Sequence, residues 1–160
     1  MPAAKLNIGM PLYGRAFTST TGLGKPYSGI GAGSWEPGVY DFKALPLPGH
    51  REYYDSEAGA TYSFSNATGM LVSYDTVDMA LRKADWVKRL GLGGVMWWEI
   101  AGDKQGKEGI VENVSLILFF FSLLFLLRYL PTPVALASAL RMETQWYERC
   151  VANQVFSSFS

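Results

Sequence analysis

The chain has 160 residues, enough for one domain of ordinary size, and its 14 basic and 14 acidic residues leave no formal net charge. Because a neutral chain offers no electrostatic basis for binding nucleic acid, we expect no nucleic-acid partner. Cys150 is the only cysteine and His50 the only histidine, which excludes an intrachain disulfide and a cysteine-rich metal site, so we expect no metal and no cofactor.

The first predicted element is a strand. Apolar residues alternate over 6–10 and predict a strand that ends near Leu12. Gly14 then lies between Tyr13 and Arg15, and glycine permits a close backbone approach or an unusual φ. Arg15 is interpreted either as a surface ion-pair residue or as a ligand-binding residue at a strand end, where parallel α/β folds place ligands.

The middle of the chain predicts loops and short strands. Residues 18–34 are rich in Gly, Ser and Thr and predict a loop, and Asp41 is predicted to cap a short helix over 42–45. Three short antiparallel strands are predicted next, over residues 51–55, 61–64 and 70–74. The turn between the last two, 66–69, contains the N-glycosylation sequon of Asn66, and a second sequon begins at Asn113; both matter only in a secreted protein.

A helix follows, with Asp75 predicted as its N-cap and Gly91 as its C-cap residue. Apolar residues at helical spacing predict one buried face, formed by Val77, Ala80, Leu81, Ala84, Val87 and Leu90. The apolar run after Gly91 ends in Trp97, Trp98 and Glu99, and its length indicates a buried strand. Because side chains alternate along a strand, one indole is expected to pack in the core while the other is free to contact a ligand such as a sugar ring.

Four segments resemble, in one consistent order, the glycoside hydrolase family 18 (the chitinases), with the character of secreted fungal members. They are Lys5-Leu6-Asn7-Ile8-Gly9-Met10-Pro11-Leu12-Tyr13-Gly14-Arg15-Ala16-Phe17, Gly33-Ser34-Trp35-Glu36-Pro37-Gly38-Val39-Tyr40-Asp41, Ser73-Tyr74-Asp75-Thr76, and the stretch from Leu90 to Asp103 that contains Gly93-Gly94-Val95-Met96-Trp97-Trp98-Glu99. The resemblance implies an α/β fold: the C-terminal part of a (β/α)₈ TIM barrel, with strands seven and eight and an inserted α+β domain. It assigns residues 1–114 to the partial catalytic domain and about 18–72 to the insertion.

The resemblance also implies a binding site for chitin or chitooligosaccharides. Trp98 matches the tryptophan that forms the floor of the sugar site where cleavage occurs, and Trp97 then packs outward against helices. Tyr13 and Arg15 match residues that line the same cleft from strand seven. Trp35 is expected either to form part of the groove wall or to pack within the insertion.

No catalytic residue is assigned. The family uses substrate-assisted catalysis, in which the substrate acetamido oxygen attacks the anomeric carbon and an enzyme glutamic acid protonates the leaving oxygen. That acid closes an Asp-x-x-Asp-x-Asp-x-Glu motif which this sequence does not contain, and the Met-x-Tyr-Asp element that holds the acetamido group is also absent. Both are expected N-terminal to Met1, and Glu99 is interpreted as a carboxylate at the barrel rim. The implied function is hydrolysis of β-1,4 links by the intact parent, with a non-catalytic chitin-binding lectin of the same fold as the alternative.

The two barrel strands leave open sheet edges, so we expect this polypeptide by itself to fold poorly or aggregate, and not to hydrolyse chitin. Residues 1–5 lack the apolar stretch of a signal peptide, although the resemblance implies an extracellular parent. Residues 115–140 are apolar apart from Arg128, but their charge-free part is short for a membrane span. They are interpreted as a possible transmembrane segment, the only route to a membrane partner, or as a translated intron, followed by a polar tail over 141–160.

Overall fold

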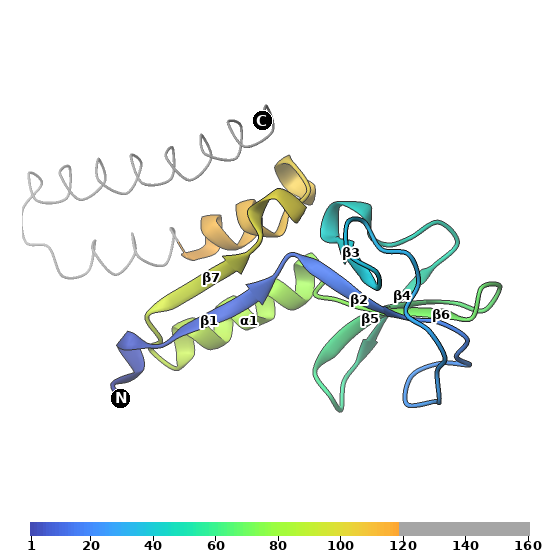
Figure 1. Cartoon of the computed structure of the whole chain (residues 1–160). Helices are drawn as coiled ribbons and strands as arrows, with labels where there is room; N and C mark the ends of the chain where they lie inside the picture. The colour runs from blue at the N-terminus through green and yellow to red at the C-terminus, as the bar shows by residue number, and fades with distance from the viewer. Residues whose placement is uncertain (119–160) are drawn as a thin grey trace, which may run out of the picture.

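A computed structural model describes residues 1–118, which form two sheets with helices packed between and beside them (Figure 1). The first sheet pairs β1 (Asn7–Pro11) with β7 (Gly94–Trp98), and the second has the strand order β3-β2-β6-β5-β4. The strands of the second sheet are β2 (Tyr13–Phe17), β3 (Val39–Asp41), β4 (Arg51–Asp55), β5 (Ala60–Ser65) and β6 (Met70–Ser73). The helical elements are η1 (Ala3–Lys5), η2 (Phe42–Ala44), α1 (Val77–Arg89), η3 (Ile100–Gly102), η4 (Gly106–Glu108) and a helix over 110–118.

The strands β1 and β7 are parallel, with register pairs from Asn7↔Gly94 to Pro11↔Trp98. One face of the pair is buried because Met10 on β1 packs in the same apolar cluster as Ala84 of α1 and Ile110 of the last helix. The opposite face, which includes Met96 and Trp98, is exposed. The predicted strand near residues 6–12 and the predicted strand that contains the two tryptophans are therefore both present, adjacent and parallel, as two neighbouring barrel strands would be.

The helix α1 begins one residue later than predicted, because Asp75 is not its N-cap. The side chain of Thr76 accepts a hydrogen bond from the Met79 N–H at 3.3 Å, which is the capping interaction. Asp75 instead forms an ion pair with Lys83. At the other end Gly91 has a φ of 61°, so the predicted role of a glycine at the helix end is confirmed.

The second sheet is antiparallel throughout, and the predicted strands over 51–55, 61–64 and 70–74 are confirmed within one residue. The turn over 66–69 closes with the Gly69 N–H donating to the Ser65 carbonyl at 2.9 Å. The sheet begins at Tyr13, ahead of the 18–72 range expected for the insertion, because β2 pairs with both β3 and β6. The strand β3 was not predicted, and the short helix predicted after it is the single 3-10 turn η2.

The two sheets share one core, which extends from Met10 and Leu12 to Val72 and Tyr74. The Tyr74 hydroxyl donates to Glu52 Oε1 at 2.6 Å, and burial, reinforced by this bond, raises the pKa of Tyr74 far above its ordinary value. The phenol therefore stays protonated and ties β4 to the end of β6.

Within residues 1–118, no helix combines the length and apolar character needed to cross a membrane. A membrane span or a translated intron was considered for residues 115–140, and of these only 115–118 are described, as the end of the last helix, while 119–140 lie outside the described residues.

Candidate functional site

The candidate site lies where the chain passes from one sheet to the other, at Leu12. The Leu12 N–H donates to the Trp98 carbonyl at 2.8 Å, and the Leu12 carbonyl accepts from the Phe42 N–H at 2.9 Å. Leu12 is fully buried, so these two bonds are shielded from water. They place the end of β7, the start of β2 and the end of β3 beside one another.

The two adjacent tryptophans point to opposite faces of β7, as predicted. Trp97 is partly buried against the shared core, whereas Trp98 is 63% exposed. Trp98 follows Met96 on the open face of the parallel pair and lies across from Pro11 of β1. The peptide bond between Trp98 and Glu99 is cis. An exposed indole at a strand end can provide a flat apolar surface for a ring-shaped ligand.

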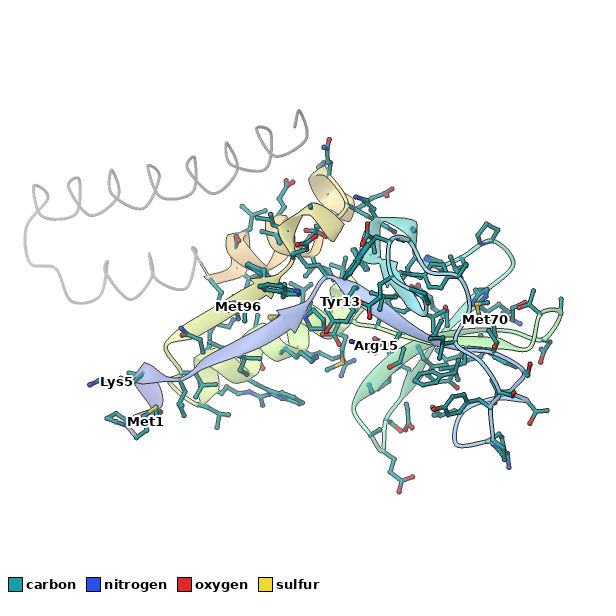
Figure 2. The ribbon with its side chains drawn as sticks, in the orientation of Figure 1. Met1, Lys5, Tyr13, Arg15, Met70 and Met96 are labelled. Carbon is teal, nitrogen blue, oxygen red and sulfur yellow. The ribbon has the colours of Figure 1, made fainter. Side chains whose placement is uncertain are left out.

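Tyr13 and Arg15 lie on the same side of β2, with Gly14 between them on the buried side. Figure 2 shows Tyr13 where β2 leaves the parallel pair and Arg15 farther along the strand. The Arg15 guanidinium carbon lies 5.7 Å from the centre of the Tyr13 ring, so the two side chains lean together. Within residues 1–118, the Arg15 side chain contacts the Tyr13 ring, and its N–H groups form no ion pair or hydrogen bond with these residues.

Gly14 is required by close packing. A Cβ atom at this position would lie 2.7 Å from Val72 Cγ1 and 2.9 Å from Leu45 Cδ1, closer than side chains tolerate. Of the two reasons considered for a glycine here, a close approach rather than an unusual φ is therefore correct. The consequence is that β2 lies tightly on the core while its two flanking side chains face outward.

Trp35 reaches the same region through a polar contact. Its indole Nε1 donates to Asp41 Oδ1 at 2.9 Å, and the other carboxylate oxygen, Oδ2, lies 3.3 Å from the Lys43 ammonium group. Lys43 also donates to the Ala101 carbonyl at 2.8 Å, which is three residues after Trp98. Trp35 is 60% exposed, so the structure places it at the surface, with its N–H edge bonded to the protein. Sequence reasoning treated Asp41 as a helix cap and missed this contact, since no local pattern links residues 35 and 41.

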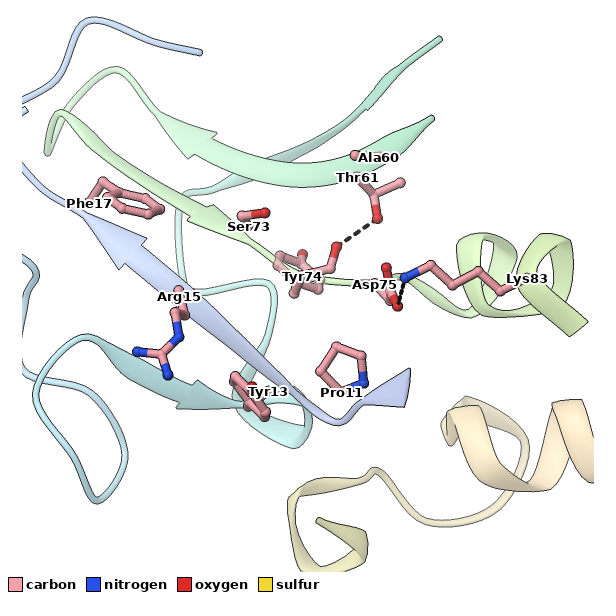
Figure 3. A pocket seen from close by; sticks show the side chains of 10 residues that line it. All are labelled: Pro11, Tyr13, Arg15, Phe17, Ala60, Thr61, Ser73, Tyr74, Asp75 and Lys83. Carbon is pink, nitrogen blue, oxygen red and sulfur yellow. Dashed lines mark hydrogen bonds and ion pairs between the residues drawn. The ribbon is translucent and has the colours of Figure 1, made fainter. Parts of the chain in front are cut away.

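An open pocket of about 460 Å³ adjoins Tyr13 and Arg15 (Figure 3). Its lining includes Ser73 at the end of β6 and the Asp75–Lys83 ion pair. The pocket thus combines hydroxyl and aromatic groups with the Arg15 guanidinium, and Asp75 pairs with Lys83, so Arg15 carries the one positive charge in the lining that is not in an ion pair. This composition suits a neutral, hydroxyl-rich ligand better than a strongly charged one.

Comparison with known proteins identifies the family. The family model for glycosyl hydrolases family 18 matches residues 1–103. The chain belongs to glycosyl hydrolase family 18. The resemblance seen in the sequence is therefore confirmed, and so is the expected fold class, a partial α/β barrel interrupted by an insertion.

Relatives of the family-18 chain include named chitinases. Endochitinase 1 of Metarhizium robertsii is 47% identical over 115 residues, which cover 72% of this chain and 27% of that protein. Chitinase 1 of Aphanocladium album is 47% identical over 113 residues, covering 71% and 27%. Among solved structures, human YKL-39, described as a pseudo-chitinase with retained chitooligosaccharide binding properties, superposes with a TM-score of 0.66 at 29% identity, covering 74% of this chain and 36% of that one. The chain thus spans about a quarter of the length of these curated relatives.

Glu99 and His50 have different surroundings in the described part of this family-18 chain. Glu99 is exposed beside the site, and within residues 1–118 no group of three or more His, Cys, Asp and Glu side chains is placed to hold a metal ion. His50, the sole histidine, lies away from the site and is partly buried, with Nδ1 3.1 Å from Ser63 Oγ.

The two glycosylation sequons differ in their surroundings. Asn66 is exposed in the β5–β6 turn. The Asn113 side-chain amide instead donates to the Lys107 and Gly109 carbonyls, at 2.9 and 2.7 Å, in the last helix. Asn66 is thus the more accessible of the two predicted acceptors.

Proposed function

We propose that the exposed surface formed by Trp98, Tyr13 and Arg15 binds chitooligosaccharides, with an N-acetylglucosamine ring stacked on Trp98. The observation that carries this proposal is the exposure of Trp98 at the end of β7, held beside Tyr13 by the Leu12 hydrogen bond. The apolar C–H face of a sugar ring loses little by leaving water and gains contact with an indole. Arg15 can then donate to hydroxyl or acetamido oxygens without breaking an ion pair in the described residues.

Trp35 is proposed as the side of the groove. Its N–H is bonded to Asp41, which restrains the indole and lowers the entropy lost when a ligand packs on it. Its exposure favours this role over simple packing within the insertion.

For the parent protein we propose hydrolysis of β-1,4 links between N-acetylglucosamine units by substrate-assisted catalysis, in an extracellular setting. The chitinase names of the relatives support this proposal. A specific observation favours a second candidate, a chitin-binding lectin: YKL-39 has a similar fold and is described as a pseudo-chitinase that retains oligosaccharide binding. A hydrolase and a lectin of this fold differ in the glutamic acid that closes the Asp-x-x-Asp-x-Asp-x-Glu motif, and the printed sequence does not contain this motif. Reading the transcript upstream of the Met1 codon for that motif separates them.

The binding proposal is tested by replacing Trp98 in the full chain, produced as a thioredoxin fusion that limits association through the open strand edges. We expect Trp98→Ala to weaken the binding of chitotriose by about tenfold or more in isothermal titration, because the stacking surface is lost. Trp86→Ala is the matched control: Trp86 is also exposed, but it lies on α1 away from the site, and its removal is expected to change nothing. Equal affinities of the two variants, with circular dichroism unchanged, would refute the assignment of Trp98.

A further inference from the structure

The turn between β5 and β6 carries a sequon that the proposed function does not use. Residues 66–69 form this turn, and its first three residues, Asn66, Ala67 and Thr68, are all exposed. The folded chain therefore presents the whole sequon at its surface, where a transferase can reach it. Figure 1 shows the turn projecting from the end of the second sheet that is farthest from β1 and β7.

The side chains of this sequon are free to react. N-glycosylation forms a bond to the asparagine amide nitrogen and requires the hydroxyl group of the third residue. Within residues 1–118, the Asn66 amide and the Thr68 hydroxyl form no hydrogen bond with the protein. Neither side chain therefore has to break a bond before it enters an active site.

Backbone bonds hold the turn in place. The Gly69 N–H donates to the Ser65 carbonyl at 2.9 Å, and the Gly69 carbonyl accepts from the Thr20 N–H at 3.0 Å. Ser65, the residue before Asn66, is buried, so the chain turns outward at the first residue of the sequon. A glycan on Asn66 then requires no rearrangement of the sheet.

The second sequon is closed by the fold. The Asn113 amide has two N–H donors, and both are used, because Nδ2 donates to the Lys107 and Gly109 carbonyls at 2.9 and 2.7 Å. The middle residue of this sequon, Val114, is fully buried, and the sequon lies inside the helix over 110–118. A transferase would have to break both bonds, unwind the helix and expose Val114.

We infer that Asn66 is an N-glycosylation site of the parent protein that stays open after folding, whereas Asn113 is not modified in the folded chain. The inference rests on the extracellular setting in the proposed function, because N-glycans are added to secreted proteins, but it does not depend on sugar binding at Trp98.

The co-substrate is an oligosaccharide linked to a polyprenyl diphosphate. The Asn66 amide nitrogen loses a proton and bonds to the anomeric carbon of the oligosaccharide. The bond between that carbon and the diphosphate oxygen breaks, and the polyprenyl diphosphate leaves.

The position of Asn66 keeps a glycan away from the proposed sugar surface. Arg15 of β2 pairs with Ser73 of β6, and the turn ends at Gly69, four residues before Ser73. At about 3.4 Å per residue, the turn lies roughly 14 Å along the strands from Arg15. Tyr13 lies farther away, because β2 begins there and runs toward the turn. A glycan thus covers one end of the sheet and leaves the sugar surface open.

The test applies a purified oligosaccharyltransferase and a lipid-linked oligosaccharide to the folded full-chain thioredoxin fusion, and glycopeptide mass spectrometry locates the modified residue. We expect a glycan on Asn66 and none on Asn113. Asn66→Gln and Thr68→Ala should each abolish the modification, and Asn113→Gln, the matched control, should leave it unchanged. A synthetic peptide over 108–118 contains the second sequon without the fold, and it should accept the glycan.

The outcomes separate this inference from the proposed function. An unmodified Asn66 in the folded chain, under conditions in which the peptide is modified, overturns the inference. Equal modification of Asn66 and Asn113 also overturns it, because the fold then does not select between them. Titration of the glycosylated fusion with chitotriose should give the affinity of the unmodified fusion, and a weaker affinity would contradict the separation of Asn66 from the sugar surface. If neither form binds chitotriose while Asn66 carries the glycan, the proposed sugar surface fails and the inference about Asn66 is supported.

Discussion

Adding one methyl group at Gly14 tests how closely β2 must lie on the shared core. In Gly14→Ala the new Cβ would lie 2.7 Å from Val72 Cγ1, 2.9 Å from Leu45 Cδ1 and 3.0 Å from Tyr74 Cβ. Val72 and Leu45 are buried and cannot swing into solvent. The strand or its neighbours must therefore shift.

The expected cost follows from two opposing terms. Overpacking of a close-packed site destabilises by about 1–3 kcal/mol. Replacing glycine by alanine gains about 0.4–1 kcal/mol, because the unfolded chain loses conformational freedom. We therefore expect Gly14→Ala to lower the free energy of unfolding by about 1–2 kcal/mol. Since Tyr13 and Arg15 flank the glycine, we also expect weaker binding of chitotriose.

A double-mutant cycle isolates the contact. Val72→Ala removes the methyl group nearest to the new Cβ, so Gly14→Ala should cost less in the Val72→Ala background, with a coupling energy of at least about 0.5 kcal/mol. Gly9→Ala is the matched control, because a Cβ there would meet only Met96 Cε, at 3.7 Å, an ordinary contact. Its effect should stay within about 0.5 kcal/mol.

The measurement is urea unfolding of the full chain at low concentration, where association through strand edges is weakest, followed by tryptophan fluorescence. Strict additivity of the two substitutions, or a Gly14→Ala midpoint equal to that of Gly9→Ala, would refute the reasoning from close approach.

Two further predictions concern the last helix and the sole histidine. Asp103→Ala should lower the free energy of unfolding by about 2 kcal/mol, because the carboxylate accepts from the Ile110 and Val111 N–H groups at 3.0 and 2.9 Å; an unchanged urea midpoint would contradict this. Burial lowers the pKa of His50 below its ordinary 6.5. The contribution of the neutral His50 side chain to the free energy of unfolding should therefore be fully present above pH 6.5 and be lost as the pH falls through the lowered pKa. His50→Gln should lack this decline between pH 7.5 and pH 5.5, and a decline of equal size in the variant would show that another group is responsible.

Local sequence patterns predicted the elements whose stability comes from a regular apolar face. The predicted buried face of α1 was correct at Ala80, Ala84 and Val87, which are buried because residues at helical spacing there also contact the core. It was wrong at Leu90, which is exposed since the helix ends at Arg89. The opposite orientation of Trp97 and Trp98 followed from strand geometry alone.

Features that depend on distant partners were not predictable. Asp75 and Thr76 are both good capping residues, and only the position of Lys83 decides which one remains for the cap. The strand β3 is too short to show a periodic pattern, and it exists because β2 offers it a paired edge. Likewise, the Trp35–Asp41 hydrogen bond forms because the turn over residues 36–39 folds back, which no pairwise rule predicts.

The position of Leu12 explains why one short segment resembles a barrel strand and also begins the insertion. Residues before Leu12 pair with β7, and residues after it pair with β3 and β6, so a continuous stretch belongs to two sheets. Both backbone groups of Leu12 are bonded, one to the Trp98 carbonyl and one to the Phe42 N–H, so neither sheet can rotate about this residue without leaving a buried polar group unpaired. A rigid joint of this kind fixes the orientation of Tyr13 relative to Trp98 by main-chain bonds. Because main-chain bonds position both residues, we expect that Trp98 can be replaced in the binding test without disturbing Tyr13.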